Sequence, residues 1–190
     1  MHIPEITEID VKGKRVLVRV DFNVSLSKDN GIINDKRIVE ALPTIRYLVD
    51  HGATVVLLSH LGRPNGKPDP SLSLVHVSAR LSELLGLGVL FMQEYIDGAS
   101  QKTIQDMKQG SVVLCENVRF HAGEEQNDPE FAKGLSRLGE IFVNDAFGTA
   151  HRSHASTVGV TAFLPSYAGF LLAREVKMIG DAVTKPKRPL

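Results

Sequence analysis

The chain has 190 residues, of which 43% are hydrophobic and 23% are charged, and this composition suits a single globular domain with a substantial core. It excludes the disordered and fibrous classes of protein. Lysine and arginine together number 22 and are balanced by 22 acidic residues, so the chain has no excess of positive charge that would attract nucleic acid or an anionic membrane.

The single cysteine and the first residues indicate the compartment. Cys115 has no second cysteine with which to form an internal disulfide, which is typical of proteins in a reducing cytosol, and its apolar neighbours favour a buried core position. The N-terminal residues lack a basic region followed by an apolar segment, and no apolar run approaches membrane-spanning length. We therefore expect a cytoplasmic monomer that binds neither nucleic acid nor membrane.

Short runs rich in β-formers alternate with helical patterns along the chain. We predict five strands, at residues 15–20, 54–58, 89–92, 112–114 and 141–143. These runs are apolar on both faces and are separated by helices, which predicts a parallel sheet covered on both sides. The expected fold class is therefore α/β, with a Rossmann-like sheet.

Amphipathic patterns predict the first helices. Residues 35–51 have a helical pattern that contains Pro43, which should kink the helix or begin a new first turn. Apolar residues recur on one helical face across residues 74–85 and stop at Gly86. Both segments are expected to cover the sheet.

Two further helices are expected in the second half of the chain. One begins at Asp128-Pro129 and ends at Gly139, with proline at its first turn and glycine after its last. The other extends over residues 172–183 and leads into residues 185–190, whose two prolines and three cations are typical of an interdomain linker. We expect residues 1–184 to form the α/β domain, and a frayed terminus is an equally good interpretation of residues 185–190.

Polar side chains follow four of the predicted strands. In an open parallel sheet, ligands bind beyond the carboxyl ends of the strands, so these positions are the first candidates for a site. Arginines lie among them or at the start of a helix, and guanidinium groups bind carboxylate or phosphate through paired hydrogen bonds. The sequence therefore predicts a site for a small polyanion. The arginines in question are Arg37, Arg63, Arg119 and Arg152, with Arg19 behind them.

The polar residues that follow the predicted strands, which include Asp21, Asn23 and His60 as well as the arginines, also have purely structural interpretations. Asp21 and Asn23 have the spacing of an Asx turn, His60 taken alone is typical of a turn histidine, and a lone arginine is usually a solvated surface residue. Arg37 differs, because Asn34 or Asp35 would cap the helix that follows and would leave this cation at the positive end of the helix dipole. A bound carboxylate would relieve that repulsion.

The sequence lacks the common nucleotide-binding motifs, and this limits the kinds of site that the chain can contain. No GxxxxGK[ST] loop is present and Gly86-Leu87-Gly88 does not fit the dinucleotide pattern, so we expect no nucleotide site in this chain. Histidines offer a weaker alternative, a metal hydrolase with a zinc site. Its ligands would come from His60, His121, His151 and His154, with Asp145 nearby.

Several stretches of the chain carry a family pattern: residues 19–24, 37–38, 41–45, 59–64, 116–121, 124–125, 144–152 and 168–172. In these stretches the chain resembles the amino-terminal half of the phosphoglycerate kinase family, and the resemblance covers essentially all 190 residues. One departure is Ser25, where the family usually has proline.

The resemblance implies one lobe of a two-lobed kinase that binds 3-phosphoglycerate or 1,3-bisphosphoglycerate, while Mg-ATP or Mg-ADP binds to a carboxyl-terminal domain absent from this chain. Asp21 and Asn23 would hold the hydroxyl and carboxylate region, and Arg37 would be the catalytic residue at the transferred phosphoryl group. The other arginines and His60 would bind the remote phosphate. The implied substrate-binding set is Asp21, Phe22, Asn23, Arg37, His60, Leu61, Gly62, Arg63, Arg119 and Arg152.

On this interpretation the chain alone should bind substrate without catalysing transfer, because both lobes must close around the reactants. A rival interpretation is a stand-alone regulatory module of flavodoxin-like build, in which the same arginines sense an anion without any reaction.

Overall fold

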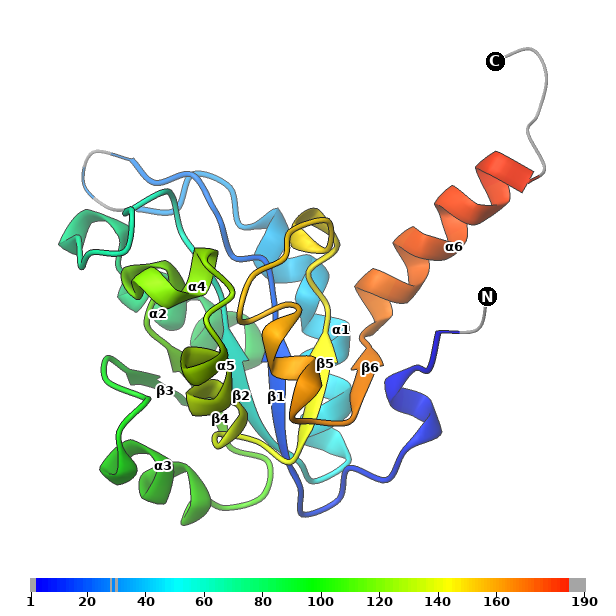
Figure 1. Ribbon diagram of the computed structural model, residues 1–190, viewed down its shortest axis with the longest axis horizontal. Coiled ribbons are helices and arrows are strands. Elements are labelled where there is room, and N and C mark those ends of the chain that lie inside the picture. The colour runs from blue at the N-terminus through cyan, green and yellow to red at the C-terminus, as the bar shows by residue number, and fades with distance from the viewer. Residues whose placement is uncertain (1–2, 28, 30, 185–190) are drawn as a thin grey trace.

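A parallel six-stranded sheet forms the centre of the protein in the computed structural model, which describes residues 3–27, 29 and 31–184 (Figure 1). The strand order is β3-β4-β2-β1-β5-β6, which places β1 and β2 in the middle. The α/β fold with a parallel sheet is thus confirmed. The strands are β1 (Arg15–Arg19), β2 (Thr54–Leu58), β3 (Val89–Met92), β4 (Val112–Cys115), β5 (Ile141–Asn144) and β6 (Ser166–Ala168).

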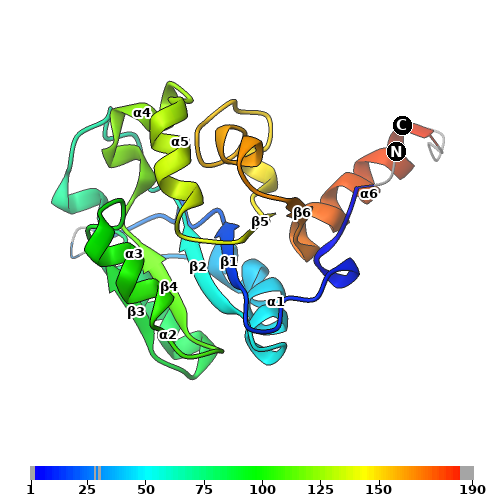
Figure 2. The same cartoon turned by 60° about the horizontal axis from the view of Figure 1, so that its bottom comes forward.

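Helices connect the strands and cover both faces of the sheet. Figure 2 shows α1 and α5 on opposite faces, as two-sided apolar strands require. The α-helices are α1 (Lys36–Asp50), α2 (Val75–Leu85), α3 (Gly98–Gln105), α4 (Ala122–Glu125), α5 (Pro129–Ser136) and α6 (Phe170–Thr184). Short 3-10 helices are η1 (Ile6–Glu8), η2 (Pro70–Leu72), η3 (Val118–Phe120), η4 (Phe147–Thr149) and η5 (Gly159–Ala162).

The core has two layers because successive side chains of a strand point to opposite faces. Val16 and Val18 of β1 pack with buried residues of α1 and α2 in one layer. Leu17, between them, packs in the other layer with buried residues of α3 and α5. Strands that are apolar on both faces therefore reflect a sheet buried on both faces.

The predicted helices are present, with adjusted ends. α1 continues through Pro43, with Ile38 and Ile45 buried on either side of it, so the packed face holds the helix together across the missing hydrogen bond. α2 ends at Gly86, which has φ of 73°. α5 begins at Asp128, whose carboxylate accepts a hydrogen bond from the Phe131 N–H at 2.7 Å.

Apart from the short 3-10 helices, three elements were missing from the sequence-based prediction: β6, α3 and α4. β6 pairs with β5 at an edge of the sheet, yet its three residues between Pro165 and Gly169 are too few to show a periodic pattern. α4 has only four residues, and α3 buries only Ile104 of its own residues. These omissions arise because an element that is short, or that buries few side chains, gives a weak periodic signal in the sequence.

The last helix, α6, extends away from the body of the sheet (Figures 1 and 2), and Met178 and Val183 on it are 61% and 74% exposed. The predicted linker, residues 185–190, lies outside the described residues. Within the described part of the chain, no helix combines the length and apolar character needed to cross a membrane.

Candidate functional site

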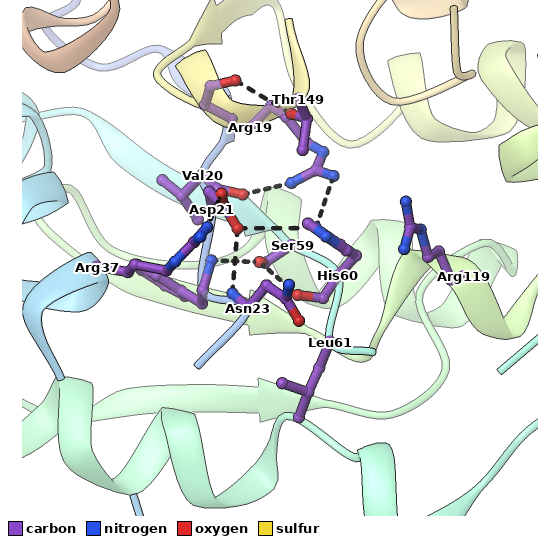
Figure 3. A network of polar contacts seen from close by, with 12 residues as sticks. Arg19, Val20, Asp21, Asn23, Arg37, Ser59, His60, Leu61, Arg119 and Thr149 are labelled. Atoms are coloured by element: carbon purple, nitrogen blue, oxygen red, sulfur yellow. Dashed lines mark hydrogen bonds and ion pairs between the residues drawn. The ribbon is translucent and has the colours of Figure 1, made fainter. Parts of the chain in front are cut away.

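The carboxyl ends of β1, β2, β4 and β5 deliver polar residues to one edge of the sheet. Arg19 at the end of β1 is in register with Leu58 of β2 and with Asn144 of β5, so the loops that follow start at one level. Figure 3 shows residues of three of these loops directed toward one another. The sheet therefore gathers side chains that are far apart in sequence.

Asp21 forms the Asx turn considered above and also pairs with Arg37. The Asn23 N–H donates to Asp21 Oδ1 at 3.2 Å, while Asp21 Oδ2 accepts from Arg37 Nη1. Asp21 thus supplies a carboxylate that offsets the position of Arg37 at the start of α1. Of the two candidate capping residues, Asn34 accepts the Lys36 N–H at 2.9 Å, whereas Asp35 binds Arg80.

The loop after β2 is built around Gly62, which has φ of 63°. Its N–H donates to Asn23 Oδ1 at 2.9 Å and its carbonyl accepts from Arg119 Nη1 at 2.8 Å. A Cβ at this position would lie 2.7 Å from Leu72 Cδ2, so glycine avoids both this contact and the strain of a positive φ. Gly62 thus joins three loops of the candidate site.

Phe22 and Leu61 anchor the same loops through the core. Both side chains are buried, the Phe22 N–H donates to Ser59 Oγ at 2.8 Å, and the Leu61 carbonyl accepts from Asn117 Nδ2 at 2.7 Å. Their side chains therefore hold the backbone in place and do not face a ligand.

Arg119 is buried, and part of its guanidinium is without a partner. Its Nη2 makes no hydrogen bond to any residue that the structure describes, and its Nε lies 3.2 Å from Glu125 Oε1. Burial lowers the pKa of Arg119, and repulsion by the charges of Arg152 and Arg63 lowers it further, against the attraction of Glu125. Arg63 and Arg152 therefore lie close enough to Arg119 for their charges to act on it.

His60 lies among the same charges and is 4% exposed. Burial lowers its pKa to about 2, and the charges of four arginines add to that effect. His60 is consequently neutral at physiological pH. The four arginines are Arg19, Arg119, Arg152 and Arg37.

Arg19 is fully buried behind this group, in line with its expected place behind the other arginines. Its Nε donates to Ser156 Oγ at 2.8 Å, Nη1 donates to the Val20 carbonyl, and Nη2 lies 3.3 Å from His60 Nδ1. Sequence reasoning assigned no role to Ser156 or to its partner Glu124. The requirement that a buried arginine in a strand have a counter-charge was the only signal for them.

The structure does not gather the histidines of the proposed zinc site. His121 stacks on Phe131, with ring centroids 4.8 Å apart, whereas His151 is exposed and His154 faces Glu124. Among residues 3–27, 29 and 31–184, no group of three or more potential ligands is placed to hold a metal ion.

A cavity of about 350 Å³ lies beside the Asp21–Arg37 pair, and Phe147, Gly148 and Leu171 contribute to its wall. A Cβ on Gly148 would lie 2.8 Å from Asp21 Oδ2, so glycine allows this loop to approach the pair. Open space thus adjoins Arg37, whose side chain is 50% exposed.

These features define an open parallel α/β domain with clustered arginines at the carboxyl edge of its sheet. A model of the family described as phosphoglycerate kinase matches residues 6–190, and the chain therefore belongs to the phosphoglycerate kinase family. Family membership does not favour the stand-alone regulatory module.

Curated relatives and solved structures agree with this assignment. The chain is 56% identical over 185 residues to the phosphoglycerate kinase of Akkermansia muciniphila, an alignment that covers 97% of this chain and 46% of the relative. For that of Thermosipho africanus the identity is 54% over 184 residues, with coverage of 97% and 46%.

Among solved structures, the phosphoglycerate kinase from Coxiella burnetii superposes with a TM-score of 0.89 at 40% identity, covering 99% of this chain and 47% of that one. The corresponding values for the enzyme from Pyrococcus horikoshii are 0.89 and 34%, with coverage of 98% and 47%. The chain thus spans about half the length of the relatives it matches and corresponds to their amino-terminal part.

Proposed function

We propose that the chain is the substrate-binding lobe of a phosphoglycerate kinase and that it binds 3-phosphoglycerate or 1,3-bisphosphoglycerate. The observation that carries this proposal is that Arg19, Arg37 and Arg119 lie around His60 (Figure 3), where their charges and that of Arg152 lower its pKa. Such a concentration of fixed positive charge at the carboxyl edge of a sheet suits a ligand with both a carboxylate and a phosphate.

The remote phosphate would be bound by Arg63, Arg119 and Arg152, with His60 as a neutral partner. Support comes from the mutual repulsion of these arginines, which a phosphate between them would relieve, and from the unpartnered Nη2 of Arg119. Each charge-assisted hydrogen bond would contribute about 1.5 to 3 kcal/mol. These contacts would chiefly orient the substrate.

The carboxylate would lie at Arg37, beside the 350 Å³ cavity. Asp21 and Asn23 would hold the hydroxyl and carboxylate region, and the backbones of Phe22, Leu61 and Gly62 would shape the surrounding loops. Asp21 already neutralises one edge of Arg37, and the exposed remainder of that guanidinium is available to a ligand.

The phosphoryl acceptor needs no general base. A carboxylic acid with a pKa of about 3.5 to 4 is already deprotonated at neutral pH, so transfer depends on positioning and charge neutralisation. A carboxylate oxygen would attack the terminal phosphorus of ATP, and the bond to the leaving ADP oxygen would break. Arg37 would stabilise the negative charge on the transferred group.

The whole enzyme would catalyse this reaction reversibly in glycolysis. Mg-ATP or Mg-ADP would bind to the protein's own carboxyl-terminal domain, with residues 1–184 as the substrate domain and 185–190 as the start of the linker. Since no nucleotide motif is present here, this chain alone would bind substrate without catalysis. We further propose that it acts as a cytoplasmic monomer.

Calorimetric titration of the chain with 3-phosphoglycerate tests the proposal. We expect saturable binding, and binding of glycerate should be much weaker because it lacks the phosphate. Arg152→Ala should reduce affinity about tenfold or more. Arg137→Ala, at an exposed arginine of the α5 C-terminus, is the matched control and should bind like the parent.

Absence of binding at millimolar ligand would refute the substrate assignment. Equal affinity of the two arginine variants would refute the phosphate site.

A further inference from the structure

A buried group of polar side chains lies directly behind His60. We call it the Arg19 cluster, and it consists of Arg19, Glu124, Ser156 and His154. Arg19 Nε donates to Ser156 Oγ at 2.8 Å, and the Ser156 hydroxyl donates to Glu124 Oε1 at 2.6 Å. The Ser156 N–H donates to Glu124 Oε2 at 2.9 Å, and His154 Nδ1 lies 3.6 Å from Glu124 Oε1.

The cluster compensates the charge of Arg19. Glu124, with 0% exposure, is the buried carboxylate of the group. Burial would raise its pKa, but contacts with His154, Arg19 and Ser156 outweigh burial and lower the pKa below its usual value. Glu124 is therefore an anion and holds Arg19 through the hydroxyl of Ser156, which fixes the orientation of the guanidinium plane.

That orientation determines which nitrogen of His60 carries the proton. Arg19 Nη2 lies 3.3 Å from His60 Nδ1, and Figure 3 shows this contact. A guanidinium group can only donate, so the contact is a hydrogen bond only if Nδ1 is unprotonated. The competing acceptor for an Nδ1 proton, Asp21 Oδ1, is 3.9 Å away and out of hydrogen-bonding range. The contact therefore favours a neutral ring whose proton lies on Nε2.

We propose that Glu124 and Ser156 are positioning residues that, through Arg19, hold His60 in the Nε2–H tautomer and so make it a neutral hydrogen-bond donor for the phosphate of the substrate. The choice of phosphate as the recipient rests on the proposed function, whereas the tautomer follows from the contacts alone.

The tautomer matters because His60 cannot contribute a positive charge. Its ring lies among arginines that oppose protonation, so any attraction to an anion must come from an N–H. In the opposite tautomer, Nε2 would carry a lone pair, which repels an anionic oxygen. A group of residues remote from the ligand thus decides whether His60 favours or opposes anion binding.

The test uses nitrogen NMR of the 190-residue chain with isotope-labelled histidine rings, without ligand. Coupling patterns and shifts identify the protonated nitrogen directly. We expect His60 in the Nε2–H form. In Ser156→Ala, Arg19 loses its link to Glu124, and His60 should become a mixture of both tautomers. Ser78→Ala, at another buried serine whose hydroxyl contacts no member of the cluster, should keep the parent spectrum.

Binding of 3-phosphoglycerate provides the second measurement. Ser156→Ala should bind roughly tenfold more weakly than the parent and Ser78→Ala with unchanged affinity. Glu124→Gln retains the shape of the side chain but removes its charge and should shift the tautomers in the same direction. Because this variant leaves Arg19 uncompensated and can fail to fold, Ser156→Ala and the parent spectrum decide the matter alone.

Two results would overturn the inference: an Nδ1–H form of His60 in the parent, or a Ser156→Ala variant indistinguishable from Ser78→Ala in tautomer and affinity. Failure of the proposed function is a different outcome, in which the parent shows the Nε2–H form but does not bind 3-phosphoglycerate.

Discussion

At the scale of single residues, Arg37 holds an electrostatically unfavourable position. As the second residue of α1 it lies at the positive end of the helix dipole, which costs about 0.3 to 1 kcal/mol for an exposed cation. Asp21 offsets that cost, and the carboxylate is shared with the Asx turn that follows β1. Arg37 is thereby oriented in advance, while half of its side chain stays accessible.

Arg37→Ala in a full-length protein that contains this sequence should lower turnover by about a hundredfold or more, because charge on the transferred phosphoryl group would lose its stabilisation. Steady-state kinetics would measure the loss. Arg46→Ala removes an arginine from the other half of the same helix, where it donates to the Leu84 carbonyl, and should leave turnover near the parent value. A normal turnover number for Arg37→Ala would exclude it from the mechanism.

His60 should make the fold sensitive to acid. Its pKa falls from 6.5 in the unfolded chain to about 2 in the folded chain, so below pH 6.5 the unfolded state binds the proton and the folded state does not. The free energy of unfolding is therefore unaffected by the titration of His60 above that pH and declines as the pH falls toward about 2. Between about pH 7 and about pH 5 the loss should be about 2 kcal/mol.

Urea denaturation at both pH values measures this contribution. His60→Asn should lose about 2 kcal/mol less than the parent on acidification. His76→Asn, at an exposed histidine, should behave as the parent does. An identical loss in the parent and His60→Asn would contradict the expectation.

At the scale of elements, the start of α6 is tied to the end of β5. Asp145 Oδ1 accepts the N–H groups of Leu171 and Leu172 at 2.8 and 3.2 Å, and the Phe170 N–H donates to Thr44 Oγ1 at 3.0 Å. Burial raises the pKa of Asp145, against these hydrogen bonds. One carboxylate thus caps α6 at the loop that borders the candidate site.

Gly169→Ala should destabilise the chain by about 1 to 3 kcal/mol, as overpacking a buried site does. The added Cβ would lie 2.3 Å from Asp145 Oδ1, and that side chain cannot move without releasing the first turn of α6. Gly180→Ala, within α6, is the control, since its Cβ would meet no atom within 4 Å. The control should be neutral or stabilising by about 0.5 to 1 kcal/mol. Equal stabilities of the two variants in chemical denaturation would refute the capping role.

At the scale of the whole molecule, the sheet edge concentrates positive charge although the net charge is zero. The field is therefore local, and it suits a small anion better than a polymer. The chain also spans about half the length of its relatives, and in our proposal the nucleotide binds to groups outside this half.

Complementation tests that division of labour. The chain alone should form no product from ATP and 3-phosphoglycerate, and addition of the separately produced remaining half should restore ATP-dependent phosphorylation. Complementation with the Arg37→Ala chain should fail even at 3-phosphoglycerate concentrations that saturate this more weakly binding variant. Product formation by the chain alone, in assays free of contaminating kinase, would contradict the proposed role of the second lobe.

Much of the fold and of the candidate site could be predicted from local patterns. Apolar runs separated by amphipathic segments determined the α/β class, since a strand apolar on both faces requires cover on both faces. The position of Asp21 or Arg119 after a strand was enough to place it at the carboxyl edge of the sheet, because parallel strands end on one side. Short elements such as β6 were not predicted, since three residues are too few to show a periodic pattern of apolar side chains.

The sequence by itself determined the class of fold, the edge at which the arginines gather and the family. Only the tertiary structure decided how their charges are compensated. Arg19 and Ser156 are 137 residues apart and Ser156 and Glu124 are 32 apart, so no local pattern links them. Which carboxylate meets which guanidinium, and which nitrogen of His60 carries a proton, depends on burial and on distances of a few ångströms, and these exist only once the chain has folded.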